Sequence, residues 1–215
     1  SVKPPHFCMA LPHIEHSTPG LFSICQMDYI EQKMNSIGFA VAGNRVEILE
    51  CLFDMNAIDP SAANDLLIYA CQFNSLDILR LYIDKLDFDI NAYDQNGKQC
   101  IHYAVLNGSI EMIQLLLDHG ANINSATQID ERTPLMLASV INKPDVVKYV
   151  LSIEDVDPSL ESKFGDNALL LASAPGFIDT IKLLIESNKI DINHQNINGA
   201  TALHNAVINN KIDAI

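Results

Sequence analysis

The chain has 215 residues, of which 48% are apolar, and 27 acidic residues against 13 basic ones give it a formal net charge of −14. This charge and the lack of any Lys/Arg run in the sequence argue against DNA or RNA as a partner and against an anionic membrane surface. The longest apolar runs are far shorter than the roughly 20 residues of a membrane-spanning helix, so we expect no membrane insertion. The partner that such a charge would attract is a protein with a basic surface.

Residues 1–30 are rich in proline and fit none of the periodicity found further along the chain. We expect this non-repeat segment to be either a cap on the following structure or the C-terminal fringe of a preceding domain. It contains residue types that suit zinc, namely His6, Cys8, His13, His16 and Cys25. Their spacing matches no common zinc finger, so we expect no metal site and no cofactor.

The five cysteines are irregularly spaced and form no C-x-x-C pair. Their odd number and spacing favour reduced thiols in a cytosol-like compartment. Three of them, Cys51, Cys71 and Cys100, fall in helical patterns, and we expect these three in the core because free cysteine is often buried.

A constant period organises the rest of the chain. Alanines recur with spacings of 30, 34, 34, 34 and 34 residues, at Ala40, Ala70, Ala104, Ala138, Ala172 and Ala206. Four residues after each alanine stands a residue that readily adopts the left-handed conformation, at Asn44, Asn74, Gly108, Asn142, Gly176 and Asn210. The pattern predicts a first helix that contains the alanine and stops at the Asn or Gly. In the fifth copy, Pro175 is expected to shorten that helix by constraining the residue before it.

A second helix is predicted after each stop. Its first turn carries an acid, which suits the positive end of the helix dipole, at Glu47, Asp77, Glu111, Asp145, Asp179 and Asp213. An apolar stripe at helical spacing follows, as in Met112, Ile113 and Leu116. A short extended element and a polar turn, such as residues 94–97, then predict a hairpin-like connection to the next copy.

Two short antiparallel helices and a turn at about 33 residues resemble the ankyrin repeat. Three segments match that family's D-x-x-G-x-T-P-L-H-x-A consensus: Asp94–Gly97 with Ile101, His102 and Ala104, then Thr133–Leu135, and Gly199–His204. Leu116–Asn124 resembles the family's end-of-repeat signature, whereas the first two copies match less well. The resemblance covers roughly residues 35–215.

The resemblance implies an all-α ankyrin-repeat solenoid, in which antiparallel helix pairs stack and are joined by β-hairpin-like turns. The repeats would occupy residues 31–215, at about 31–59, 60–93, 94–127, 128–161 and 162–195, with a truncated copy at 196–215. Thr133 would cap a helix whose first turn accommodates Pro134. His102 and His204 would bridge neighbouring repeats by hydrogen bonds rather than serve catalysis or bind a metal.

The resemblance also places the turn tips and the first helices on a concave side that holds a partner. The candidate partner-binding residues are those that the fold constrains least: Tyr93, Gln95, Asn96, Lys98, Leu106, Asn107, Ile129, Asp130, Arg132, Ile141, Lys163, Phe164, Asp166, Ile197, Asn198 and Asn209. Three of them, Ile129, Phe164 and Ile197, stand at successive turn tips, and an exposed apolar row there would mark an interaction site. The alternative is that the three pack against one another between adjacent turns. Phe73 is expected to pack under the N-terminal segment or, alternatively, to contact a partner.

The sequence contains no nucleophile elbow, phosphate-binding loop, H-E-x-x-H or EF-hand motif, so we predict no catalytic residue. We therefore expect a protein–protein interaction module or scaffold in the cytoplasm, and not an enzyme. The alternative is the substrate-targeting arm of a larger enzyme, such as a kinase, a ubiquitin ligase or a bacterial effector, whose catalytic domain lies outside this chain. For a secreted effector the compartment would be the host-cell cytoplasm. The missing initial methionine and the stop inside the sixth copy favour a larger parent protein.

Overall fold

The computed structural model describes residues 36–55 and 63–211, which belong to one unit spanning Ser36–Ile215. In these residues the chain forms helices and turns but no strand. The first helices of the successive copies are α2 (Ser36–Ala42), α4 (Ala63–Gln72), α6 (Cys100–Asn107), α8 (Pro134–Val140), α10 (Ala168–Ser173) and α12 (Ala202–Ile208). The second helices are α3 (Val46–Asp54), α5 (Leu76–Lys85), α7 (Ile110–Asp118), α9 (Pro144–Ser152) and α11 (Ile178–Glu186).

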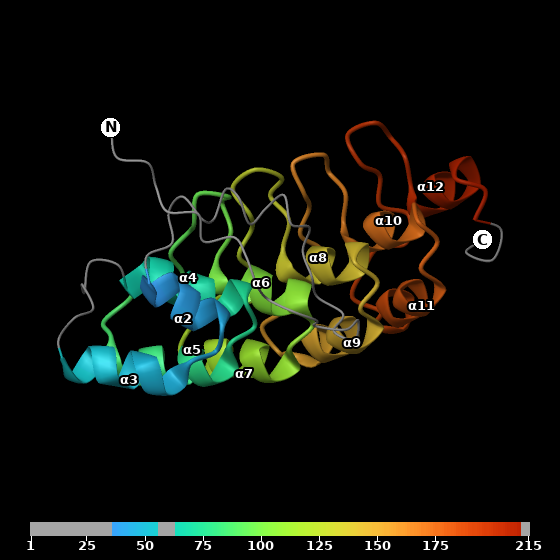
Figure 1. Cartoon of the computed structure of the whole chain (residues 1–215). Helices are drawn as coiled ribbons and strands as arrows, with labels where there is room; N and C mark the ends of the chain where they lie inside the picture. Colours follow the sequence, from blue (N-terminus) through green and yellow to red (C-terminus); the bar gives the residue numbers. More distant parts are fainter. Residues whose placement is uncertain (1–35, 56–62, 212–215) are drawn as a thin grey trace, which may run out of the picture. The chain divides into compact units, whose positions relative to one another are not determined.

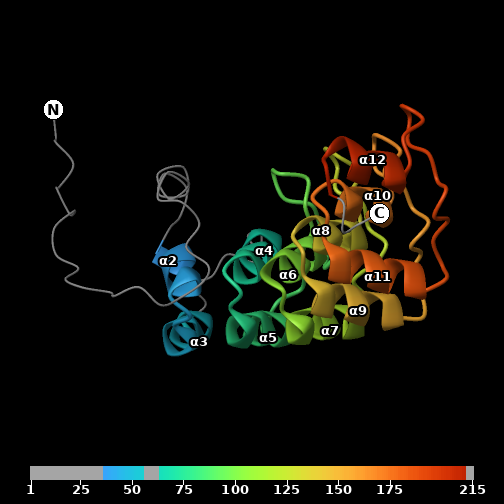
Figure 2. The same ribbon diagram turned by 90° about the vertical axis from the view of Figure 1, so that its right-hand side faces the viewer.

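The two sets of helices form two layers (Figure 1). Each first helix packs against the first helix of the next copy, as α4 does against α6 and α6 against α8. Among the second helices, α3 packs against α5 and α9 packs against α11. In the view of Figure 2, α5, α7 and α9 lie in a row below α4, α6 and α8. This arrangement is the predicted all-α solenoid of stacked helix pairs.

A residue in the left-handed conformation joins the two helices of each copy. The backbone angle φ lies between 50° and 79° at Asn44, Asn74, Gly108, Asn142, Gly176 and Asn210. The N–H of the next residue donates to the carbonyl of the repeat alanine in all six copies, for example from Ser109 to Ala104 at 3.0 Å. This bond satisfies a carbonyl that the end of a helix otherwise leaves unpaired. The predicted stop of each first helix is confirmed.

Local side chains also define where the helices begin. Thr133 Oγ1 accepts a hydrogen bond from the N–H of Met136 at 3.4 Å, and Pro134 opens α8, where no N–H is needed. The predicted acids lie in the first turns of the described second helices, at Glu47, Asp77, Glu111, Asp145 and Asp179. Helices of this length are marginal in isolation, so caps and dipole partners assist the packing.

Proline shortens the first helix of the fifth copy, but not for the predicted reason. Helix α10 ends at Ser173, and it is the shortest of the described helices. Ala174, which precedes Pro175, still has helical angles of φ −60° and ψ −47°. The helix therefore ends because Pro175 has no N–H to continue the ladder, and not because the proline ring forces Ala174 out of the helical region.

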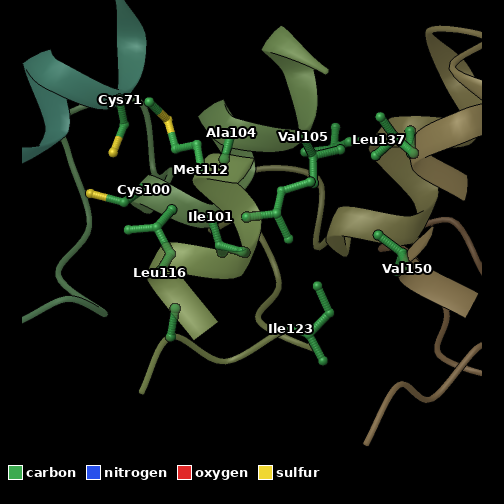
Figure 3. Packing of buried hydrophobic residues seen from close by; sticks show 14 of the residues in the cluster. Cys71, Cys100, Ile101, Ala104, Val105, Met112, Leu116, Ile123, Leu137 and Val150 are labelled. Carbon is green, nitrogen blue, oxygen red and sulfur yellow. The ribbon is translucent and has the colours of Figure 1, made fainter. Parts of the chain in front are cut away.

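The core lies between the layers and is built from equivalent positions of successive copies (Figure 3). The repeat alanines are buried, and their small side chains allow adjacent first helices to approach closely. The second helices contribute larger buried residues at one repeated position, as at Leu79, Ile113 and Val147. A single copy cannot enclose these side chains, so their burial depends on stacking.

The expected burial of three cysteines is wrong for one of them. Cys71 and Cys100 are buried, whereas Cys51 on α3 is exposed. Leu49 is the buried residue of α3. Cys51 follows it by two positions and therefore points roughly 200° away around the helix.

The last copy exposes apolar positions that are buried elsewhere. Leu203 is 54% exposed and Val207 is 56% exposed, whereas the equivalent Ile101 and Val105 of α6 are fully buried. The next copy packs on α6 through α8, but no described helix follows α12. In the described residues, α12 therefore leaves an apolar edge exposed.

The buried side chain of His102 links the first helix of the third copy to the segment that follows the second helix of that copy. Its Nδ1 accepts from the N–H of Gln99 at 2.9 Å, and its Nε2 lies 3.0 Å from the carbonyl oxygen of Ser125 and donates to it. Burial lowers the pKa of His102 to about 4, although the bond to Ser125 opposes this shift. Ser125 and Gln99 both belong to the third copy (about 94–127), so these bonds join parts of one copy and not, as the family resemblance had implied, neighbouring repeats. His204 makes the equivalent of the first of these bonds, because its Nδ1 accepts from the N–H of Thr201 at 3.2 Å.

The left-handed positions predict a difference between two small substitutions at Asn74, whose φ is 55°. Asn74→Ala should destabilise the chain by about 1 kcal/mol, because a Cβ-bearing residue without a polar side chain disfavours this conformation. Asn74→Gly should be neutral or slightly stabilising. Urea unfolding followed by circular dichroism would measure both. Equal midpoints for the two variants would contradict the explanation.

The depressed pKa of His102 predicts a loss of stability in acid. The unfolded chain takes up a proton near pH 6.5, whereas the buried ring does so only near pH 4. The stabilisation by the neutral ring is therefore complete above pH 6.5 and is lost as the pH falls toward 4, by roughly 3 kcal/mol in all. His102→Met, which introduces the residue found at the equivalent Met136, removes this titration. The gap in unfolding free energy between native and variant should narrow from pH 7 to pH 4, and a constant gap would refute the assignment.

Candidate functional site

Three of the turns between copies are closed in the same way at their base. The first residue donates its N–H to the carbonyl of the fifth, at 2.8 to 3.0 Å, in the pairs Asp94–Lys98, Ser162–Asp166 and Asn196–Ala200. A side-chain oxygen of the first residue accepts the N–H of the fifth in return. The turn at residues 127–132 has one residue more and accommodates it with Glu131 in the left-handed conformation. These bonds give each turn a defined shape without using the side chains at its tip.

Backbone hydrogen bonds join the tips of adjacent turns. They run from Gln128 N to Gly97 O at 2.9 Å, from Lys163 N to Asp130 O at 3.0 Å and from Ile197 N to Phe164 O at 3.2 Å. The turns approach so closely that a Cβ built on Gly165 would lie 2.9 Å from the nitrogen of Ile197. Glycine is therefore required there both for its positive φ of 72° and for the close approach. We call the surface formed by these turns and the first helices the turn face.

Apolar side chains stand at three successive tips of the turn face. Ile129 is 60% exposed, Phe164 is 46% exposed and Ile197 is 69% exposed. The backbone bonds between turns hold these residues, here called the tip row, on neighbouring connections. Because all three side chains keep large exposed areas, mutual packing between adjacent turns does not bury them. The row is an apolar surface that the fold leaves uncovered.

Several predicted partner-binding residues make bonds within the chain. The hydroxyl of Tyr93 donates to the carbonyl of Ala126 at 3.1 Å, in the next turn. The amide of Asn107 donates to the carbonyl of Cys71 at 2.7 Å, at the end of the preceding first helix. Asp166 Oδ1 accepts from Asn196 Nδ2 at 2.8 Å. These side chains tie adjacent copies together, which reduces their freedom to meet a partner.

The other predicted residues lie on the turn face with fewer restraints from the fold. Lys98 lies over the ring of Tyr103, with Nζ 6.0 Å from the ring centroid, and Asn96 Nδ2 donates to Asp94 at 3.2 Å. The amide of Asn209 donates within α12. Exposed members of the set are Gln95, Lys163 and Asn198, and half-buried ones are Leu106, Asp130, Arg132 and Ile141. Phe73 is also exposed, and its expected contact with residues 1–30 lies outside the described residues.

Sequence reasoning missed one row of the turn face. In the third copy the residue before the repeat alanine faces the turn, because the hydroxyl of Tyr103 donates to Asp94 Oδ2 at 2.5 Å. The same carboxylate oxygen accepts from Gln72 Nε2 at 3.3 Å. Equivalent positions in other copies hold Phe39, Tyr69, Leu137, Leu171 and Asn205. A search for bulky residues at fixed distance from the alanine would have found this row.

The tyrosines of this row stay protonated at neutral pH. Burial raises the pKa of Tyr103 to about 12, with a further contribution from its hydrogen bond to Asp94. Burial also raises the pKa of Tyr69, together with the negative charges of Asp65 and Asp94. Both side chains therefore act as neutral rings with a hydroxyl donor, a combination common in protein interfaces.

The acidic residues concentrate away from the turn face. Second helices and the segments after them carry Glu47, Glu50, Asp54, Asp77, Asp84, Asp87, Asp89, Glu111, Asp118, Asp145, Glu154, Asp155, Asp157, Asp179, Glu186 and Asp191. The turns and first helices hold fewer charges of both signs, and the bases among them are Lys98, Arg132 and Lys163. The negative field is thus strongest on the side of the second helices.

The described residues contain no group of three or more His, Cys, Asp or Glu side chains placed to hold a metal ion. The residues of zinc-binding type near the N-terminus lie outside the described part of the chain, namely His6, Cys8, His13, His16 and Cys25. In residues 36–55 and 63–211 there is also no helix with the length and apolar character to cross a membrane.

Known proteins place these repeats in a family. A family model of ankyrin repeats matches residues 37–127, 67–159 and 135–215. The chain is 37% identical over 106 residues to alpha-latroinsectotoxin-Lt1a of Latrodectus tredecimguttatus, covering 49% of this chain and 7% of that protein. It is 30% identical over 129 residues to the nuclear factor NF-kappa-B p105 subunit of Rattus norvegicus, covering 57% and 13%. It is 28% identical over 142 residues to an L-asparaginase of Dirofilaria immitis, covering 66% and 23%.

The chain thus spans less than a quarter of the length of each of these relatives. The match to the family model, in contrast, extends from residue 37 to residue 215 and includes every described first and second helix except the first residue of α2. The chain belongs to the ankyrin-repeat family.

Proposed function

We propose that this chain is a protein-interaction module that holds its partner on the turn face. The observation that carries the proposal is the tip row, in which Ile129, Phe164 and Ile197 remain exposed on turns that backbone hydrogen bonds hold side by side. Exposed apolar side chains on a rigid support lose little conformational freedom when a partner covers them. Such side chains supply much of the free energy of protein association.

The first helices would extend this contact surface. Their residues that face the turns include the rings of Tyr69 and Tyr103 and the partly buried Leu106 and Ile141. Tyrosine is favoured in interfaces because its ring is apolar and its hydroxyl can bond to a partner. A partner with an apolar segment therefore fits this surface better than a highly charged one.

The acidic second helices support a separate contribution to binding. They would attract a basic partner within about 10 Å, the screening length near 0.1 M salt, and so raise the association rate. The apolar turn face would then provide the short-range contact. In this proposal a partner carries both a basic surface and an apolar segment, and nucleic acid is not a partner because it shares the sign of the chain's charge.

A substrate-targeting arm of a larger enzyme is the second candidate. It is supported by the similarity to an L-asparaginase, of which the matching region is 23%. The binding surface would be the same in this case, and the catalytic domain would lie outside the chain. The free thiols of Cys51, Cys71 and Cys100 support a reducing compartment such as the cytoplasm for either candidate.

Removal of two side chains from the tip row tests the proposal. We expect the double variant Phe164→Ala/Ile197→Ala to bind a captured partner about 10- to 100-fold more weakly, because two exposed apolar anchors are lost. The partner would be isolated from a cell lysate with the native chain as bait, identified by mass spectrometry and then titrated by calorimetry. Both side chains are largely exposed, so the thermal midpoint should stay unchanged.

The matched control removes two exposed apolar side chains from the second helices. Ile48→Ala/Ile110→Ala deletes side chains of 51% and 38% exposure on α3 and α7. This variant should bind the partner as the native chain does. Equal weakening by the two double variants, or full binding by the tip-row variant with an intact fold, would show that the tip row is not the site.

A further inference from the structure

Two cysteines meet at the contact between the second and third copies. Cys71 lies near the end of α4 and Cys100 is the first residue of α6, and these two helices pack against each other. Both side chains are buried, with exposures of 0% and 1%. In Figure 3 the two sulfur atoms lie beside each other, and the Cys100 thiol is close enough to contribute to raising the pKa of Cys71.

The stacking register accounts for this meeting. Cys71 follows the repeat alanine of its copy by one residue, and Cys100 precedes the next repeat alanine by four. The equivalent positions at the other contacts hold no second pair of cysteines, since they contain Val41 with Leu66, Val105 with Pro134, Ser139 with Ala168, and Ser173 with Ala202. The sulfur pair is therefore a property of this one contact and not of the repeat as such.

We propose that Cys71 and Cys100 form a reversible disulfide that cross-links the second copy to the third. The oxidant is a small disulfide of the glutathione class. One protein thiolate attacks a sulfur of that disulfide and expels one small thiolate. The other protein thiolate attacks the mixed disulfide, closes the Cys71–Cys100 bond and expels the second small thiolate. The two protons lost by the protein thiols end on the two small thiols.

The folded structure restrains this reaction. Burial raises the pKa of Cys71, and the neighbouring Cys100 thiol raises it further, so the thiolate that must attack is scarce. A small disulfide also has no path to sulfur atoms with no exposed surface. Oxidation therefore requires the contact between α4 and α6 to open, and the rate should follow that opening. Exposed Cys51 has no such restraint on access.

The cross-link would act on the structure around the turn face. It closes a loop that contains residues 72–99, including Gln72 and Asp94, which bond to one another across the two copies. Once closed, the bond limits the separation of α4 from α6. The oxidised chain should consequently be more stable, because the disulfide restricts the unfolded chain. This inference does not depend on the identity of any partner or on the proposed function.

The test uses the full chain with Cys8, Cys25 and Cys51 replaced by serine, so that Cys71 and Cys100 are its remaining thiols. Incubation with oxidised glutathione should produce a monomer 2 Da lighter, and peptide mapping should identify the Cys71–Cys100 bond. The thermal midpoint should rise by roughly 5–10 °C and return to its starting value on reduction with dithiothreitol.

Matched controls come from the chain's own repeats. Cys71→Val introduces the residue found at the equivalent Val41 and Val105, and Cys100→Ala the residue found at Ala168 and Ala202. Each variant, in the same serine background, should fold and show no rise in midpoint with oxidised glutathione. The proposal is overturned if the two-cysteine chain gives no cross-linked peptide even after refolding in glutathione buffer. A midpoint that falls on oxidation, or rises equally in Cys71→Val, would also overturn it.

Discussion

The hydrogen bond from the residue after each left-handed Asn or Gly back to the repeat alanine is the interaction on which the rest of the structure depends. It ends every first helix at the same distance from its alanine and directs the chain into the second helix. The alanine also lies buried at the contact between adjacent first helices. The alanine therefore takes part both in the bond that ends the helix and in the close approach of the copies, which keeps the stacking register constant from copy to copy.

At the turns, the groups that hold the structure together differ from the side chains that are available to a partner. The turn bases close with their own backbone and capping side chains, and the tips join through one backbone bond to the next. The tip side chains make no demand on this framework, so apolar residues such as Phe164 and Ile197 can stand there without weakening the fold. The acids, in contrast, lie mostly on the second helices and the segments after them, and the helix dipole favours the one in each first turn. Short-range apolar contact and long-range attraction consequently arise on different sides of the chain.

Departures from the common pattern give individual copies their properties. One carboxylate oxygen of Asp94 closes its turn, and the other accepts hydrogen bonds from Gln72 and Tyr103. Ser162 has a single side-chain oxygen at the equivalent position, and it is occupied by its own turn. His102 and the Cys71–Cys100 pair are likewise confined to particular copies. The conserved spacing of the array thus determines the stack, while single substitutions decide which contacts are bonded, titratable or open to oxidation.

The sequence alone determined the helices, their stops, the acids of the second helices and the family, because each of these depends on residues close together along the chain. The tertiary structure decided which side chains are free. It assigned Asn107 and Asp166 to bonds between copies, brought Tyr69 and Tyr103 to the turn face, and placed Cys51 outside the core. A period of 34 residues states which positions are equivalent, but not which of them meet across two copies. That depends on the direction of each side chain and on the packing register, which exist only once the helices are stacked.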